Sequence, residues 1–113
     1  MKTKVKVYIA SQYSVGDKIE NVNRQITMAD KLMNLGFIPF VPLYSHYQHT
    51  LYPRSYDSWM ELDYAWIDSC DCLLRLKGES SGADKEIEYA LSIGIPVFYS
   101  VLELTEYYTK TEK

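Results

Sequence analysis

The chain has 113 residues, of which 47% are hydrophobic and 24% are charged. This length and balance are typical of a globular protein, so we expect residues 1–113 to form one domain with its own core. The net charge of −3 gives no electrostatic basis for binding nucleic acid or an anionic membrane. No apolar run reaches transmembrane length, and the first residues are typical of a strand and not of a signal peptide. With two cysteines and no export signal, the chain is expected to be a soluble cytoplasmic protein.

Four β-rich segments alternate with helical patterns along the chain. Strands are expected at residues 5–10, 37–41, 72–76 and 96–99. Helices are expected at residues 19–35, 58–69 and 83–93, with one more short helix in the tail. Residues 42–55 are expected to form a long loop, which in so small a domain is more often functional than idle.

The ends and inward faces of the helices follow from individual residues. Asp17 is the expected N-cap of the first helix, and Gly36 is its expected stop. Ser58 and Glu61 have the spacing of a capping box that opens the second helix. The apolar stripe expected on the first helix consists of Ile19, Val22, Ile26, Ala29 and Met33.

This β-α-β-α-β-α-β order predicts an α/β fold, a flavodoxin-like parallel sheet of about four strands with helices on both faces. Right-handed crossovers give the strand order 2-1-3-4. Ligands of such sheets bind beyond the carboxyl ends of the strands, where the order reverses. Here that place lies between the first and third strands, bordered by residues 11–14 and 77–82.

Helical wheels place a carboxylate on the inward face of two predicted helices: Asp63 on the second and Glu86 on the third. The apolar arcs consist of Trp59, Leu62, Trp66 and Cys70, flanked by Met60 and Ile67, and of Ala83, Ile87, Ala90, Leu91 and Ile93. A buried carboxylate needs a partner, a ligand or a shifted pKa. The structural alternative is a loop cap or an ion pair with Arg24, Arg54 or Arg75. Two inward acids near one cleft are also the equipment of a retaining glycosidase, in which one attacks the anomeric carbon and the other handles the proton.

Other candidate sites have weaker support in the sequence. His46 and His49 lie three residues apart in a proline-bounded segment without a third ligand, so we predict no metal site. Cys70 and Cys72 are expected to pack in the core. Gly16 stands alone, so the chain has neither a dinucleotide fingerprint nor a phosphate-binding loop.

Several motifs occur together, in order along the chain. They are Lys6-Val7-Tyr8-Ile9-Ala10, then Asp63 eight residues before Asp71, then Ser80-x-Gly82-x-x-x-Glu86-Ile87-x-Tyr89-Ala90. Over about residues 5–100 the chain resembles the nucleoside 2-deoxyribosyltransferase superfamily, most of all its small bacterial and phage members. The resemblance implies that Glu86 attacks C1′ of a nucleoside, that Asp63 assists proton transfer to the departing base, and that Tyr8 orients Glu86.

The resemblance also implies contacts to the substrate. Ser80 stands where the transferases often have an aspartate and where the related deoxynucleoside-monophosphate N-hydrolases have a serine that contacts the 5′-phosphate. Those hydrolases have an arginine in the loop after the first strand, whereas this chain has Ser11-Gln12-Tyr13-Ser14. The predicted substrate-binding residues are Ser11, Gln12, Ser14, Ser80 and Gly82.

The leading hypothesis is therefore cleavage or transfer at the N-glycosidic bond of a nucleoside or nucleoside monophosphate through a covalent Glu86 intermediate. No cofactor is expected, because a carboxylate nucleophile and a proton donor suffice. The alternatives are a nucleotide-sensing module of the same fold and a purely structural or oligomeric role, which the inward acids disfavour. The base, the sugar, the 5′ group, the acceptor and the pathway stay open.

We also expect a homodimer or a larger homo-oligomer. Tyr44, Tyr47 and Tyr52 supply aromatic surface of the kind found in interface cores. The superfamily's assemblies complete their sites at subunit contacts, and two-fold symmetry is the commonest solution.

Overall fold

The computed structural model describes residues 5–111. Its elements are β1 (Lys6–Ala10), α1 (Lys18–Asn34), β2 (Ile38–Phe40), the 3₁₀ turn η1 (Pro42–Tyr44), α2 (Ser45–Leu51), α3 (Tyr56–Asp68), β3 (Cys72–Arg75), α4 (Ser81–Ser92), β4 (Val97–Phe98) and α5 (Val101–Thr111). The strands form one parallel sheet in the order β2-β1-β3-β4, which confirms the predicted topology. Pro39 lies on the edge strand β2, where a missing N–H costs least. None of the helices in this described part combines the length and the apolar character needed to cross a membrane.

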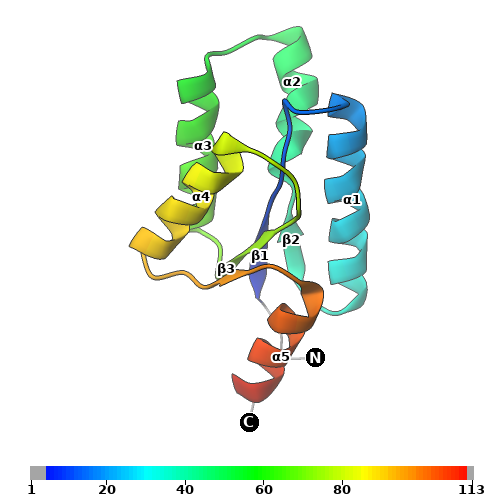
Figure 1. Cartoon of the computed structure of the whole chain (residues 1–113), viewed down its shortest axis with the longest axis vertical. Coiled ribbons are helices and arrows are strands. Elements are labelled where there is room, and N and C mark those ends of the chain that lie inside the picture. The colour runs from blue at the N-terminus through cyan, green and yellow to red at the C-terminus, as the bar shows by residue number, and fades with distance from the viewer. Residues whose placement is uncertain (1–4, 112–113) are drawn as a thin grey trace.

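Helices cover both faces of the sheet (Figure 1), with α3 and α4 on one side and α1 on the other. Successive side chains of a strand point to opposite faces, so β1 serves two cores. Val7 and Ile9 pack in the cluster that includes Leu32 of α1 and Leu104 of α5. Tyr8 and Ala10 pack in the other cluster, against α3 and α4. This alternation turns Tyr8 toward the side on which Asp63 and Glu86 lie.

Both cysteines belong to the core, as predicted. Cys70 and Cys72 are buried and free of disulfides. Burial raises the pKa of the Cys70 thiol to about 11 and that of Cys72 to about 12. Both thiols are therefore protonated and unreactive at neutral pH.

The helix ends confirm one predicted cap and correct another. Asp17 caps α1, its Oδ1 accepting a hydrogen bond from the Glu20 N–H at 3.0 Å. Ser58 does not open α3, because Ser55 does so, its Oγ accepting from the Ser58 N–H at 3.1 Å. The predicted helix over residues 83–93 begins earlier, at Ser81 with Ser80 as N-cap.

The predicted loop over residues 42–55 is wrong, because most of it is the turn η1 and the helix α2. Pro42 occupies the first position of η1, where its fixed φ favours a helical start. Residues 45–51 contain neither glycine nor proline, and Pro53 follows the end of α2. The helix α2 buries none of its residues, so this segment has no apolar stripe from which a helix could be predicted.

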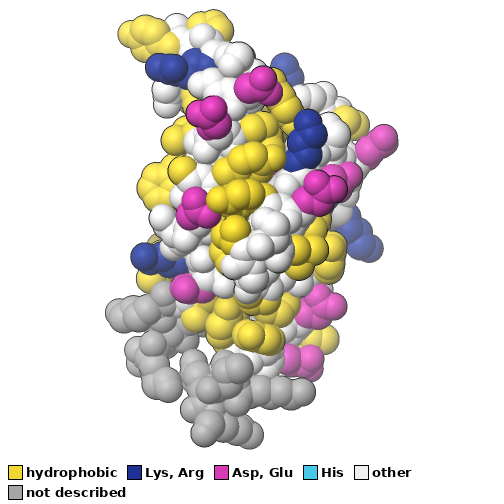
Figure 2. Space-filling view, turned by 90° about the vertical axis from the view of Figure 1, so that its left-hand side faces the viewer, with side chains coloured by type: hydrophobic (Ala, Val, Ile, Leu, Met, Phe, Trp, Pro, Cys, Tyr) yellow, Lys and Arg dark blue, Asp and Glu magenta, His cyan; other side chains and the backbone are white. Residues whose placement is uncertain are grey.

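The predicted apolar stripe of α1 is confirmed in its middle, where Val22 and Ala29 are buried and Ile26 packs against the core, but not at its two ends. Ile19 is 45% exposed and Met33 is 63% exposed, whereas the polar Asn21 and Gln25 are buried. On the other side of the sheet α4 buries only a narrow stripe of Ala83, Glu86 and Ala90. Four residues of the predicted apolar arcs are exposed instead, which corrects that prediction: Leu62 and Trp66 on α3, Leu91 on α4, and Ile93 at the C-cap of α4. Hydrophobic side chains gather along this α3–α4 side in Figure 2.

The tyrosines expected at an interface are accessible. Tyr44, Tyr47 and Tyr52 are all exposed, on and next to η1 and α2. Association through this surface stays a prediction.

Candidate active site

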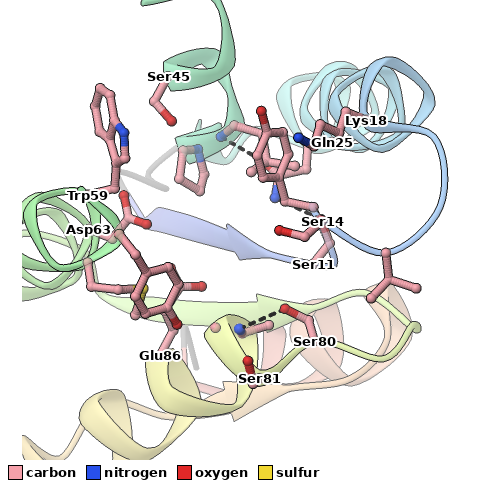
Figure 3. Close-up of a pocket in the computed structure, with 18 of the residues that line it drawn as sticks. Ser11, Ser14, Lys18, Gln25, Ser45, Trp59, Asp63, Ser80, Ser81 and Glu86 are labelled. Atoms are coloured by element: carbon pink, nitrogen blue, oxygen red, sulfur yellow. Dashed lines mark hydrogen bonds between the residues drawn. The ribbon is translucent and has the colours of Figure 1, made fainter. Parts of the chain in front are cut away.

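A cavity of about 380 Å³ opens at the carboxyl ends of β1 and β3, in the predicted place. Its walls come from the loop after β1, the first half of α1, the η1–α2 segment, α3, the loop before α4 and the first two turns of α4. Figure 3 shows Asp63, Glu86, Ser11 and Ser80 around this common space. Segments far apart in the sequence thus meet at one edge of the sheet.

Glu86 is the buried acid of this cavity, with only 6% of its surface exposed. Its carboxyl group accepts a hydrogen bond at Oε2 from the Tyr8 hydroxyl, 2.8 Å away. Tyr8 is fully buried on β1, and burial together with the nearby Glu86 charge raises its pKa well above the usual value. Tyr8 therefore stays protonated and fixes the orientation of Glu86 as a donor.

Asp63 lies half-buried on α3 and shares a hydrogen bond with Glu86. Burial raises the pKa of Asp63 to about 6. Burial, and then the charge of Asp63, raises the pKa of Glu86 well above its usual value. Two carboxylates in contact cannot both be charged at low cost, so this arrangement favours sharing one proton between them.

Arg75 is buried but does not neutralise this pair. Its guanidinium donates to the backbone oxygens of Leu76 and Gly78 and forms an ion pair with Asp84 at 3.4 Å. At longer range its charge lowers the pKa of Glu86, against the larger effect of burial. Within residues 5–111 neither carboxyl group has an arginine partner, so the structural alternative of a buried ion pair does not describe this site.

The loops carry most of the predicted substrate-binding residues into the cavity. Ser11, Ser14, Ser80 and Gly82 line it. Gln12 lies outside the lining, because its Nε2 donates to the Val15 oxygen at 3.0 Å and to Asn21 Oδ1 at 3.3 Å. Its role in the structure is to hold the loop after β1.

Gln12 also packs on Gly78, in the loop between β3 and α4. A Cβ atom at position 78 would lie 1.9 Å from Gln12 Oε1, and the φ angle there is +135°. Only glycine suits both conditions. The two loops that border the cavity are therefore held against each other at this contact.

Gly78→Ala is expected to lower the free energy of unfolding by about 2 kcal/mol or more, through backbone strain and the clash. Gly94→Ala is the matched control, since Gly94 has φ +83° with nothing within 4 Å of the added Cβ. Adding Gln12→Ala to Gly78→Ala should recover part of the loss, as measured by urea unfolding. Equal losses in the two single variants, with no recovery, would contradict this packing.

Gln25 is a cavity residue that the sequence reasoning missed. It is fully buried, and its Nε2 donates to the Ile9 oxygen at 3.1 Å and to Ser11 Oγ at 2.8 Å. Its Oε1 accepts from the Leu43 N–H at 3.2 Å. The sequence does carry a signal for it, because Gln25 is a polar residue three positions after Val22 on the inward side of α1.

The two histidines have roles in joining segments around the cavity. His46 Nδ1 is hydrogen-bonded to the Tyr13 hydroxyl, and His49 Nδ1 accepts from Trp59 Nε1 at 2.8 Å. In the part of the chain that the structure describes, no three potential ligands gather to hold a metal ion. Trp59, predicted to be a core residue, instead lines the cavity.

Comparison with known proteins assigns the chain to a family. No curated protein sequence matches it. The family described as a domain of unknown function, DUF4406, matches residues 5–99. This range runs from β1 through β4 and includes Tyr8, Asp63 and Glu86. The chain therefore belongs to the DUF4406 family.

Proposed function

We propose that this protein breaks the N-glycosidic bond of a nucleoside or nucleoside 5′-monophosphate, with Glu86 as the covalent nucleophile. The observation that supports the proposal is the buried Glu86–Asp63 pair, oriented by Tyr8 and facing a ligand-sized cavity. The motifs shared with the nucleoside 2-deoxyribosyltransferase superfamily supply the substrate class, and we propose membership of that superfamily on the same basis.

The protonation of the pair suits this chemistry. A departing base needs a proton, and the attacking carboxyl group needs a negative charge. Burial raises the pKa of both carboxyl groups, and their mutual repulsion favours a state with one proton and one negative charge on the pair. The resting proton lies on Glu86 and reaches Asp63 through the hydrogen bond that the two groups share.

The first half of the reaction then follows. The Glu86 oxygen forms a bond to C1′ while the C1′–N bond breaks, and its electron pair stays on the base. The proton passes from Asp63 to a nitrogen of the base, which leaves neutral. Water or a second base next attacks C1′ and releases Glu86, with Asp63 taking up the proton.

Contact between the carboxyl groups favours retention of configuration over inversion. Inverting glycosidases separate their two carboxyl groups to leave room for a water molecule on the far face of the sugar. Asp63 and Glu86 are hydrogen-bonded to each other, a closer approach than the inverting arrangement requires. We therefore propose the retaining mechanism, which proceeds through a covalent intermediate.

The remaining lining residues suggest where the sugar and its 5′ group lie. Ser80 and Gly82 begin α4, whose N-terminal N–H groups favour anionic ligands. Lys18 and Arg54 add two cationic side chains to the lining. These groups favour a 5′-monophosphate over an uncharged nucleoside.

The direct test is incubation with the common deoxynucleosides, ribonucleosides and their 5′-monophosphates, followed by chromatography of the free bases. The proposal expects release of base from at least one member, and faster release from a monophosphate than from its nucleoside. Binding without release across the panel would contradict catalysis and favour the nucleotide-sensing alternative.

The pH dependence of kcat/KM provides a prediction from the same pair. Below the Asp63 pKa of about 6 a second proton binds, which removes the negative charge that Glu86 needs. We expect kcat/KM to fall by about tenfold per pH unit on this acid side. A profile that stays flat through this region would show that the ionisation of the pair does not limit the reaction.

A further inference from the structure

Trp59 lies one helical turn before Asp63 on α3. Residues four apart on a helix share a face, and both line the cavity. Figure 3 shows the Trp59 indole next to the Asp63 carboxyl group, on the wall opposite the Ser11 and Ser14 loop. A group that accepts a proton from Asp63 would therefore enter the cavity along a wall that Trp59 also lines.

The indole is held in place through its nitrogen. Trp59 Nε1 donates to His49 Nδ1 at 2.8 Å, and the Arg54 N–H donates to the same atom at 3.2 Å. The His49 ring meets the indole edge-on, at an interplanar angle of 69°. The polar atom of Trp59 is thus already used, and what the side chain can offer a ligand is its flat face.

A purely structural role would suit Trp66 better than Trp59. Trp66, seven residues later on α3, stacks on Phe40 with ring centroids 4.5 Å apart and an interplanar angle of 23°. Trp59 is half-buried, and its ring contact in the described part of the chain is the edge-on one with His49. Among residues 5–111 no ring stacks in parallel on the Trp59 indole, so its flat face is open to a flat ring of a ligand in the cavity.

We propose that Trp59 is the stacking surface for the aromatic base of the substrate, and that His49 is the residue that positions it. This inference rests on the proposed function for the identity of the reacting bond. Because the indole contributes no hydrogen bond to the ligand, it recognises a flat ring and not a pattern of donors and acceptors. Larger rings overlap it more, so purines bind more tightly than pyrimidines.

Binding is measured on the Glu86→Gln chain, which does not consume the ligand. With Trp66→Phe added, Trp59 is the remaining tryptophan, and titration with deoxyadenosine 5′-monophosphate should quench its fluorescence. By calorimetry, Trp59→Leu should weaken binding by about 10- to 100-fold, the usual worth of one aromatic–base stack. Trp59→Phe should keep most of the affinity, because it keeps a ring. Trp66→Phe should change nothing.

His49 is tested by a pair of variants. His49→Ala frees the indole and should weaken binding of the nucleotide, whereas His49→Asn keeps an acceptor and should restore part of the affinity. Both effects should disappear when Trp59→Leu is already present, since His49 acts through Trp59. Equal losses with and without Trp59 would overturn the positioning role.

The outcomes separate this inference from the proposed function. Nucleotide binding that depends on Trp59, without base release by the unmodified chain, would keep the stacking surface and reject the glycosidic reaction. If the unmodified chain releases base and Trp59→Leu keeps the same affinity and kcat/KM, the glycosidic reaction is kept and the stacking surface is rejected. If Trp59→Leu fails to fold, the fluorescence titration decides, and an absence of quenching by every purine and pyrimidine 5′-monophosphate overturns the proposal.

Discussion

Glu86→Gln is expected to reduce base release by about 10³-fold or more while the chain stays folded, because an amide cannot form the glycosyl ester. Glutamine keeps the size of the side chain and an oxygen to accept the Tyr8 hydroxyl hydrogen bond seen at 2.8 Å. Since burial raises the pKa of Glu86 and so favours its neutral form, a neutral amide suits the same surroundings. Turnover is followed by chromatography of the free base, and folding by thermal denaturation.

Glu88→Gln is the matched control, because Glu88 is an exposed residue on the same helix. It should leave turnover and stability unchanged. Near-native activity in Glu86→Gln would remove Glu86 from the role of nucleophile. Loss of folding in that variant would indicate a structural role for the buried carboxyl group.

Asp63→Asn is expected to slow kcat by about 10²- to 10⁴-fold, the usual contribution of a positioned acid. The loss should be much smaller with 7-methyl-2′-deoxyguanosine, because its positively charged base leaves without taking up a proton. Glu61→Gln, at an exposed position of α3, should have no effect with either substrate. Equal losses with both substrates would show that Asp63 does not act through proton transfer.

The stability of Asp63→Asn has a defined pH dependence. A carboxyl group whose pKa is higher in the folded than in the unfolded chain binds its proton more tightly when folded, so folding loses stability as pH rises between the two values. For Asp63 that window runs from 3.8 to about 6. We therefore expect Asp63→Asn to melt at or above the wild-type temperature at neutral pH, with the difference vanishing below this window. A large loss of stability at neutral pH would contradict a charge held for function.

Much of the fold was predictable because the strands of a parallel sheet carry strong local signals. The β-rich run ending at Ala10 and the short Leu-rich run at residues 72–76 predicted β1 and β3. Glycines that end helices, such as Gly36 and Gly94, separated the helices from the strands that follow. The strand order then followed from the handedness of the crossovers.

The predictions that failed depend on tertiary contacts. Residues 45–51 carry no apolar stripe, and the helix α2 they form buries none of its residues. The inward side of α1 includes Gln25, because a buried amide is favourable where three backbone and side-chain partners surround it. The contact of Gln12 with Gly78 could not be predicted either, because it joins loops 66 residues apart and has no local sequence signature.

The two acidic residues of the candidate site could be predicted from the sequence, whereas several residues that line the cavity could not. An acid on an apolar helix face is conspicuous, so Asp63 and Glu86 were found from periodicity and Tyr8 from the resemblance. An aromatic residue on such a face is not conspicuous, and Trp59 was therefore assigned to the core. The orientation of its indole depends on a hydrogen bond to His49 of α2, a helix that was not predicted from the sequence.

The measurement that tests the covalent Glu86 intermediate most directly is the stereochemistry of transfer to methanol. The protein is incubated with a β-deoxynucleoside or its 5′-monophosphate in buffer containing methanol, and any methyl glycoside is identified by proton NMR. Two displacements at C1′, the first by Glu86, predict the β-anomer, with no product from the Glu86→Gln chain. Formation of the α-anomer would mean that the acceptor attacks the substrate directly, and it would contradict Glu86 as the nucleophile.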